Sequence, residues 1–150
     1  MTSADGPRVG NAVVSSEWSE FYEETHVPAA VRVGDTLHVT GHTGETADGR
    51  YPADREAQIR QTFTNIAVTL AEAGASWRDV VSMTTYHVEL SGQRELLVTV
   101  AHDFLQAPFP AWSAVGVTEL WSPAAICEIS CIAALKGVNA PPASIKEEAL

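Results

Sequence analysis

The chain has 150 residues, of which 45% are hydrophobic and 19% are charged, and its formal net charge at pH 7 is −10. This length supports one domain with its own hydrophobic core. The negative charge argues against a nucleic-acid partner, because phosphate binding relies on Lys and Arg. No segment reaches the length of a membrane span, and residues 1–7 lack the apolar stretch of a signal peptide. We therefore expect a cytoplasmic protein with no membrane partner.

The first part of the chain predicts a β-hairpin behind a polar start. Ala12–Ser16 is a candidate for a short edge strand. Residues 17–24 are acidic and aromatic, which predicts either a turn of helix or an irregular arm. Two β-branched runs within residues 27–41 flank the turn dipeptide Gly34–Asp35, as expected for a hairpin. Residues 41–44 have a glycine at each end and are expected to form a loop.

The clearest helical signal of the chain begins at Asp54, a suitable N-cap, and ends at Gly74. Apolar residues recur there at steps of three and four, which predicts one buried stripe: Ile59, Phe63, Ile66, Leu70 and Ala73. A strand, a second helix and two further strands are predicted after it, at residues 80–90, 93–106, 111–118 and 124–136.

The predicted elements follow the order β-β-α-β-α-β-β, which favours an α+β domain. In such a domain, two helices cover one face of a mixed sheet. We expect the domain to span residues 16–137, between a flexible N-terminus at residues 1–15 and a flexible tail at residues 138–150.

One carboxylate, Glu128, lies inside the apolar run of residues 124–135. A buried, unpaired carboxylate is so unfavourable that its pKa rises and the group stays partly protonated. A carboxyl group in that condition can act as a general acid or base. The alternative is a carboxylate that is exposed on the open face of the sheet or paired with an arginine. Glu128 is the first candidate for a catalytic residue.

The cysteines and histidines do not predict a metal site or a disulfide. Cys127 and Cys131 would lie about 13 Å apart along one strand, too far to bridge each other, and small buried core residues are the simpler interpretation. His38 and His42 are separated by a similar distance, too far to share an ion. His42, in its glycine-flanked segment, is a candidate substrate-facing residue; a surface position is the alternative.

Six segments of the chain, in order and at the expected spacing, resemble the RidA/YjgF family: Val31–Gly41, Gln61–Ile66, Leu70–Ala75, Asp79–Thr85, Phe109–Val115 and Cys127–Ala133. The resemblance covers residues 27–136. It implies a chorismate-mutase-like fold and a homotrimer whose sheets form a central barrel, with small-molecule clefts at the subunit interfaces. It also implies hydrolysis of reactive enamines and imines, such as 2-aminoacrylate, to a keto acid and ammonia, without a cofactor.

The resemblance also assigns roles to individual residues. Glu128 matches the glutamate that positions water or moves protons. Thr40 and Gly41 match a Ser-Gly pair that lines the pocket, and the backbone around them and around Ala111 would polarise the substrate.

Three positions depart from the family pattern, which places this chain in an arginine-lacking branch. Trp112 occupies the position at which the family has an arginine that clamps the substrate carboxylate. Val27 occupies the position of a tyrosine that lines the family's pocket, and Val98 falls near the position of an asparagine on the family's second helix. Because tryptophan offers one N–H and a large apolar surface, we expect a bulkier, less acidic substrate that stacks on Trp112.

The sequence thus predicts an enamine/imine deaminase-type hydrolase, or a related acid–base enzyme, for a small apolar or aromatic molecule in an inter-subunit cleft. The alternative is a non-catalytic small-molecule-binding or chaperone-like trimer that has lost deaminase activity. The ribonuclease activity attributed to some relatives fits poorly with the net charge of −10.

Overall fold

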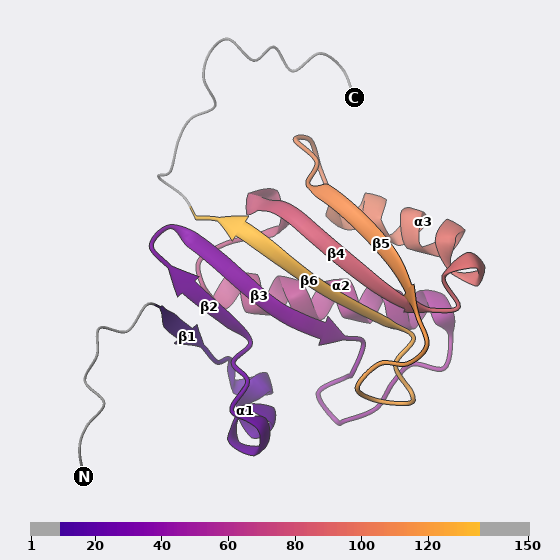
Figure 1. The fold of residues 1–150 in the computed structure, drawn as a ribbon, viewed down its shortest axis with the longest axis horizontal. Helices are drawn as coiled ribbons and strands as arrows, with labels where there is room; N and C mark the ends of the chain where they lie inside the picture. The colour runs from indigo at the N-terminus through magenta and orange to yellow at the C-terminus, as the bar shows by residue number, and fades with distance from the viewer. Residues whose placement is uncertain (1–9, 136–150) are drawn as a thin grey trace.

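A computed structural model describes residues 10–135 and contains one six-stranded sheet (Figure 1). The strand order is β1-β2-β3-β6-β4-β5. All neighbouring strands are antiparallel except β4 and β5, which are parallel. The strands are β1 Asn11–Val13, β2 Ala30–Val33, β3 Thr36–Thr43, β4 Val80–Val88, β5 Ala111–Val117 and β6 Cys127–Ala134. The predicted mixed sheet is confirmed.

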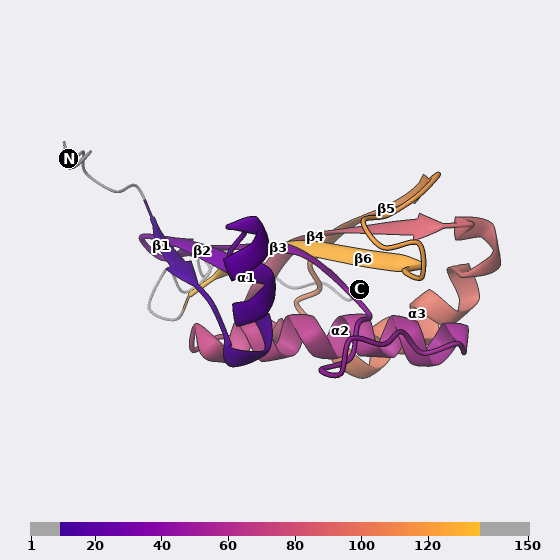
Figure 2. The ribbon, with the colours of Figure 1, turned by 90° about the horizontal axis from the view of Figure 1, so that it is seen from below.

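The two long helices, α2 (Arg55–Glu72) and α3 (Arg94–Phe104), cover one face of the sheet and leave the other uncovered by helices (Figure 2). A 3-10 turn at Ser16–Trp18 leads into a third, short helix, α1 (Ser19–Thr25), beside the β1-β2-β3 side of the sheet. We call residues 16–25 the arm. For residues 17–24 the sequence predicted either a turn of helix or an irregular arm, and the structure shows that they are helical. The predicted flexible tail, residues 138–150, lies outside the described residues.

The core lies between the sheet and the two covering helices. The Asp54 carboxylate accepts a hydrogen bond from the Ala57 amide at 2.9 Å and so caps α2, as its sequence predicted. The stripe of α2 contributes fully buried side chains: Ile59, Phe63, Ile66 and Leu70. Alternate residues of β6 face them: Cys127, Ile129, Cys131 and Ala133. Both cysteines are free and buried, as expected, and burial raises the pKa of each thiol to about 12.

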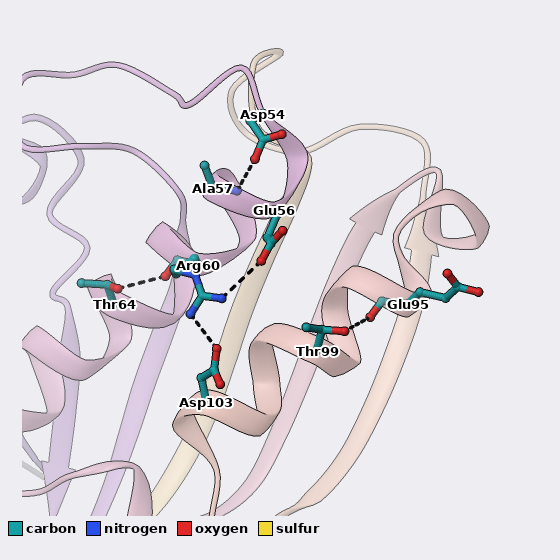
Figure 3. A network of polar contacts seen from close by, with 8 residues as sticks. All are labelled: Asp54, Glu56, Ala57, Arg60, Thr64, Glu95, Thr99 and Asp103. Atoms are coloured by element: carbon teal, nitrogen blue, oxygen red, sulfur yellow. Dashed lines mark hydrogen bonds and ion pairs between the residues drawn. The ribbon is translucent and has the colours of Figure 1, made fainter.

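Polar contacts join the outer surfaces of α2 and α3 (Figure 3). The Arg60 guanidinium lies 2.9 Å from the Asp103 carboxylate of α3 and 3.4 Å from Glu56 one turn earlier on α2. These ion pairs are solvent-exposed, so screening leaves them little net stabilisation. The attachment of α3 comes instead from its buried face, where Leu97 and Val100 pack into the core.

A buried glutamine holds the start of β6 in place. The Gln58 side chain of α2 donates to the carbonyls of Pro52 and Ala124 at 3.1 Å each, and it accepts from the Ile126 amide at 2.7 Å. The Gln58 amide thus provides hydrogen-bond partners for backbone groups just before β6, where no neighbouring strand pairs with them. The strand therefore starts at Cys127 rather than at residue 124.

The predicted loop at residues 41–44 is wrong, because β3 continues to Thr43. A register shift between Val39 and His42 interrupts its pairing with β6, after which His42 pairs with Ile129. The continued pairing satisfies the backbone groups that a loop would leave to solvent. Among residues 10–135, no helix is long and apolar enough to cross a membrane.

Candidate functional site

A cavity of about 570 Å³ lies where β3 and β6 meet the arm. The arm forms one wall, and the loop after β3, with residues 45–51, forms another. The end of β3, one side of α2, Trp121 and Glu128 complete the lining. The cavity is thus assembled from segments that are far apart in the sequence.

Glu128 projects from the face of the sheet that carries no helix. It pairs with Thr43 of β3 on one side and Tyr86 of β4 on the other. Its carboxylate is partly buried, and no residue in the range 10–135 forms a hydrogen bond or an ion pair with it. Burial raises the pKa of this carboxyl group. The result is a carboxyl group that lines a cavity and is free to exchange a proton.

Gly41 makes room for that carboxyl group. A β-carbon placed on residue 41 would lie 2.8 Å from Cδ and 2.9 Å from Oε2 of Glu128. Real β-carbons do not approach other atoms so closely, so any larger residue would displace the carboxyl group. The structure therefore brings together Gly41 and Glu128, two of the residues that the sequence assigned to one site.

His42 is a buried strand residue with 2% of its surface exposed. Its Nδ1 lies 2.6 Å from the Thr40 carbonyl, which can only accept, so Nδ1 carries the proton. Its Nε2, 2.8 Å from Oγ1 of Thr69, then accepts from that hydroxyl. Burial lowers the pKa of His42 to about 4. Although His42 lines the cavity, both nitrogens are already engaged, so the exposed alternative is wrong.

Thr40 supports the site from behind rather than lining the cavity. Its hydroxyl donates to the Pro28 carbonyl at 2.7 Å, and its amide donates to the Ala29 carbonyl at 3.0 Å. These bonds fasten β3 to the chain that leads into β2. Its carbonyl also fixes the His42 ring.

Trp112 and Glu128 lie on opposite faces of the sheet within one chain. Trp112 pairs with Met83, a core residue that faces the helices, whereas Glu128 pairs with Tyr86, three positions further along β4. Residues an odd number of positions apart on a strand point to opposite faces. The structure therefore does not bring the predicted stacking platform to the predicted catalytic group of its own chain.

A buried chain of hydrogen bonds fixes Trp112 on the helix side. Its indole N–H donates to Oγ1 of Thr85 at 3.0 Å, and the Thr85 hydroxyl donates to Nε2 of His87 at 2.8 Å. Nδ1 of His87 donates to the side-chain oxygen of Gln93 at 2.9 Å, because the Gln93 amide group is already donating to two carbonyls. This direction of donors requires a neutral His87, and burial lowers its pKa.

The other predicted substrate-binding residues lie outside the cavity of their own chain. The Val27 carbonyl accepts from the indole N–H of Trp18 at 2.8 Å and so anchors the arm. Val98 is 45% exposed on α3, and Ala111 is exposed at the start of β5. Neither position lines the cavity that contains Glu128.

Sequence reasoning missed the aromatic and acidic lining that the arm supplies. Trp18 packs against the ring of His42 with centroids 4.2 Å apart, and Phe21 meets Trp18 edge-on at 5.0 Å. The acidic and aromatic composition of residues 17–24 was visible, but its position beside Glu128 depends on how the arm folds back. Within the described chain, no cluster of three His, Cys, Asp or Glu side chains could hold a metal ion.

Comparison with known proteins identifies similar sequences. The family described as Endoribonuclease L-PSP matches residues 20–135. The RutC family protein YjgH of Escherichia coli K12 is 38% identical over 110 residues, covering 73% of this chain and 84% of that protein. A 2-iminobutanoate/2-iminopropanoate deaminase of Dermatophagoides farinae is 36% identical over 97 residues, covering 61% of this chain and 72% of that protein.

Solved structures share the fold. The structure of protein YJGH superimposes with a TM-score of 0.77 at 36% identity, covering 85% of this chain and 98% of that chain. The overall fold is therefore shared with that protein over almost its whole length.

Proposed function

The chain belongs to the RidA/YjgF family, and on that premise we propose that it is an enamine/imine deaminase-type hydrolase or a related acid–base enzyme. The observation that carries the proposal is Glu128, whose carboxyl group lines a cavity, has a raised pKa and forms no ion pair with another described residue. A relative of this chain carries the name 2-iminobutanoate/2-iminopropanoate deaminase, which supports the reaction class.

The chemistry needs a group that can accept and return one proton. In the proposed reaction, water attacks the imine carbon while the Glu128 carboxylate takes a proton from that water. The protonated Glu128 gives that proton to the nitrogen, which yields a neutral carbinolamine. Glu128 then carries the remaining hydroxyl proton to the same nitrogen, the carbon–nitrogen bond breaks, and ammonia leaves as the carbonyl forms. An enamine is first protonated on carbon. A raised pKa suits both roles, because it brings the two forms of the carboxyl group closer in population at neutral pH.

We further propose a homotrimer with the site at the interface between subunits. The face of the sheet that carries Glu128 has no helix over it and exposes apolar side chains, among them Val115 and Ile132. A neighbouring subunit would cover them. In this arrangement the cleft beside Glu128 of one subunit would also be lined by residues of a neighbouring subunit, namely Val27, Val98, Ala111 and Trp112. Within a single chain these four residues do not reach Glu128.

The alternative is a small-molecule-binding or chaperone-like trimer without catalysis, and one observation favours it. Trp112 stands where the family arginine would clamp a carboxylate, and its only N–H is bonded to Thr85. Trp112 therefore supplies no replacement for that clamp.

The decisive experiment is an ammonia-release assay with a panel of imines that differ in charge and in apolar bulk. Glu128→Gln keeps the size of the side chain but removes proton transfer, so we expect kcat to fall by about 100-fold. Asp103→Asn, at the exposed end of α3, loses only a surface ion pair with Arg60; it is the matched control and is expected to match the wild type. An inactive wild type, or a fully active Glu128→Gln variant, would reject the proposed catalysis.

A further inference from the structure

All charged residues that line the cavity beside Glu128 are acidic. They are Glu17, Glu20, Glu24, Glu45, Asp48 and Glu128, and no Lys or Arg of residues 10–135 lines the cavity. Three come from the arm, two from the loop after β3 and one from β6. Because three separate segments each place negative side chains at the cavity, the negative potential is concentrated there. A single acidic helix face exposed to solvent would not produce this arrangement.

Little of this charge is neutralised by the protein. Asp48 pairs with Arg50 at 3.5 Å and accepts a hydrogen bond from the Thr46 hydroxyl. None of the other five carboxylates forms an ion pair with a residue in the range 10–135. His42 adds no positive charge at neutral pH, because burial lowers its pKa to about 4.

The apolar part of the lining is aromatic. Trp18 and Phe21 are held against each other on the arm, and the Trp18 indole is further fixed by its bond to the Val27 carbonyl. Trp121 also lines the cavity and is 82% exposed. Aromatic faces attract organic cations through the negative charge of their π-systems. Carboxylates and aromatic rings in one cavity therefore favour the same kind of ligand.

We propose that this cavity binds a small organic monocation, a protonated amine or iminium that carries an apolar group, and that it rejects carboxylates. The inference rests on the proposed function only in taking this cavity as the substrate site. An imine would bind as its protonated iminium, which is the form that water attacks most readily. The acidic lining would then select the protonated, reactive form of the substrate. This selection would take the place of the arginine that holds the substrate carboxylate in the family pattern.

Three probes of similar size and different charge test this proposal on the full chain. Binding of benzylammonium, benzyl alcohol and benzoate is measured by calorimetry or ligand-observed NMR at low and high salt. We expect benzylammonium to bind at least about tenfold more tightly than benzyl alcohol, with its affinity falling as salt rises. Benzoate is expected not to bind. Equal binding of benzoate and benzylammonium would overturn the proposal.

A matched pair of double variants separates the cavity from the net charge of the protein. Glu20→Gln/Glu24→Gln removes two cavity charges and is expected to lower the affinity for benzylammonium by about tenfold. Glu56→Gln/Asp103→Asn removes two charges from the outer surfaces of α2 and α3, outside the cavity, and is expected to leave the affinity unchanged. An equal loss in both variants would show a diffuse charge effect and refute a cation site.

The binding result is independent of catalysis. Selective benzylammonium binding without imine hydrolysis would uphold the cation site and reject the proposed enzyme. Efficient hydrolysis of carboxylate-bearing imines, without benzylammonium binding, would uphold the enzyme and reject the cation site.

Discussion

Gly41 and Glu128 lie so close together that a β-carbon on residue 41 would meet the carboxyl carbon of Glu128 at 2.8 Å. The glycine is needed for space, since its φ lies outside the left-handed region. Gly41→Ala should therefore fold but push the Glu128 carboxyl group out of position. We expect at least about a tenfold loss of any Glu128-dependent turnover, because small displacements of a reacting group are costly.

The control for this substitution is Gly116→Ala on β5. A β-carbon at residue 116 meets only Leu90, at an ordinary contact distance of 3.6 Å. Turnover and melting temperature are measured for both variants. Equal activity of Gly41→Ala and Gly116→Ala would show that the contact between Gly41 and Glu128 does not matter for catalysis.

The burial of His42 predicts acid sensitivity of the fold. Its pKa is about 4 in the folded chain, against 6.5 for a solvent-exposed histidine such as the unfolded chain presents. Because the folded pKa is the lower one, unfolding takes up a proton between these values, and stability is lost as the pH falls from 6.5 towards 4. The loss attributable to His42 is about 3 kcal/mol over that range.

Urea unfolding at pH 7 and at pH 4.5 measures this loss. His42→Gln removes the titrating group, so its free energy of unfolding should change less with pH than that of the wild type. His87, whose pKa is also lowered by burial, contributes to both proteins and cancels in the comparison. The same pH dependence in both proteins would contradict the assignment to His42.

The hydrogen bonds behind Trp112 predict a structural effect on stability. Trp112→Phe removes the donor to Thr85 and should cost about 1 kcal/mol of unfolding free energy. Thr85→Val should cost more, about 1–3 kcal/mol, because Nε2 of the buried His87 then loses its partner. Chemical denaturation of both variants checks the order. A Trp112→Phe variant that is less stable than Thr85→Val would contradict the central place of the Thr85 hydroxyl in these hydrogen bonds.

Gln58 should stabilise the fold more than Gln61, a half-buried glutamine one turn later on α2. Gln58→Ala leaves the Ile126 amide and two carbonyls without their side-chain partner and should destabilise the protein by about 2 kcal/mol. Amide exchange at Ile126 should accelerate. Gln61→Ala is the control, since Gln61 bonds only to the Asn65 side chain of the same helix. Similar losses in the two variants would contradict this role.

The sequence alone determined the order of the main helices and strands and the character of Glu128, although it placed a loop where β3 continues to Thr43. The apolar stripe of α2 and its Asp54 cap are properties of neighbouring residues, so a local pattern predicts them. A carboxylate among apolar residues likewise predicted a raised pKa for Glu128, and burial does raise it. Six matching segments together identified the family.

Only the tertiary structure decided how the predicted residues meet. The pairing register of β4 with β5 and β6 places Trp112 and Glu128 on opposite faces, and register depends on contacts between distant segments. The burial of His42 required both the continued β3 strand and the arm that folds over it. The acidic cavity exists for the same reason: its charges are close in space but separated along the chain, so no local pattern reveals that they share one field.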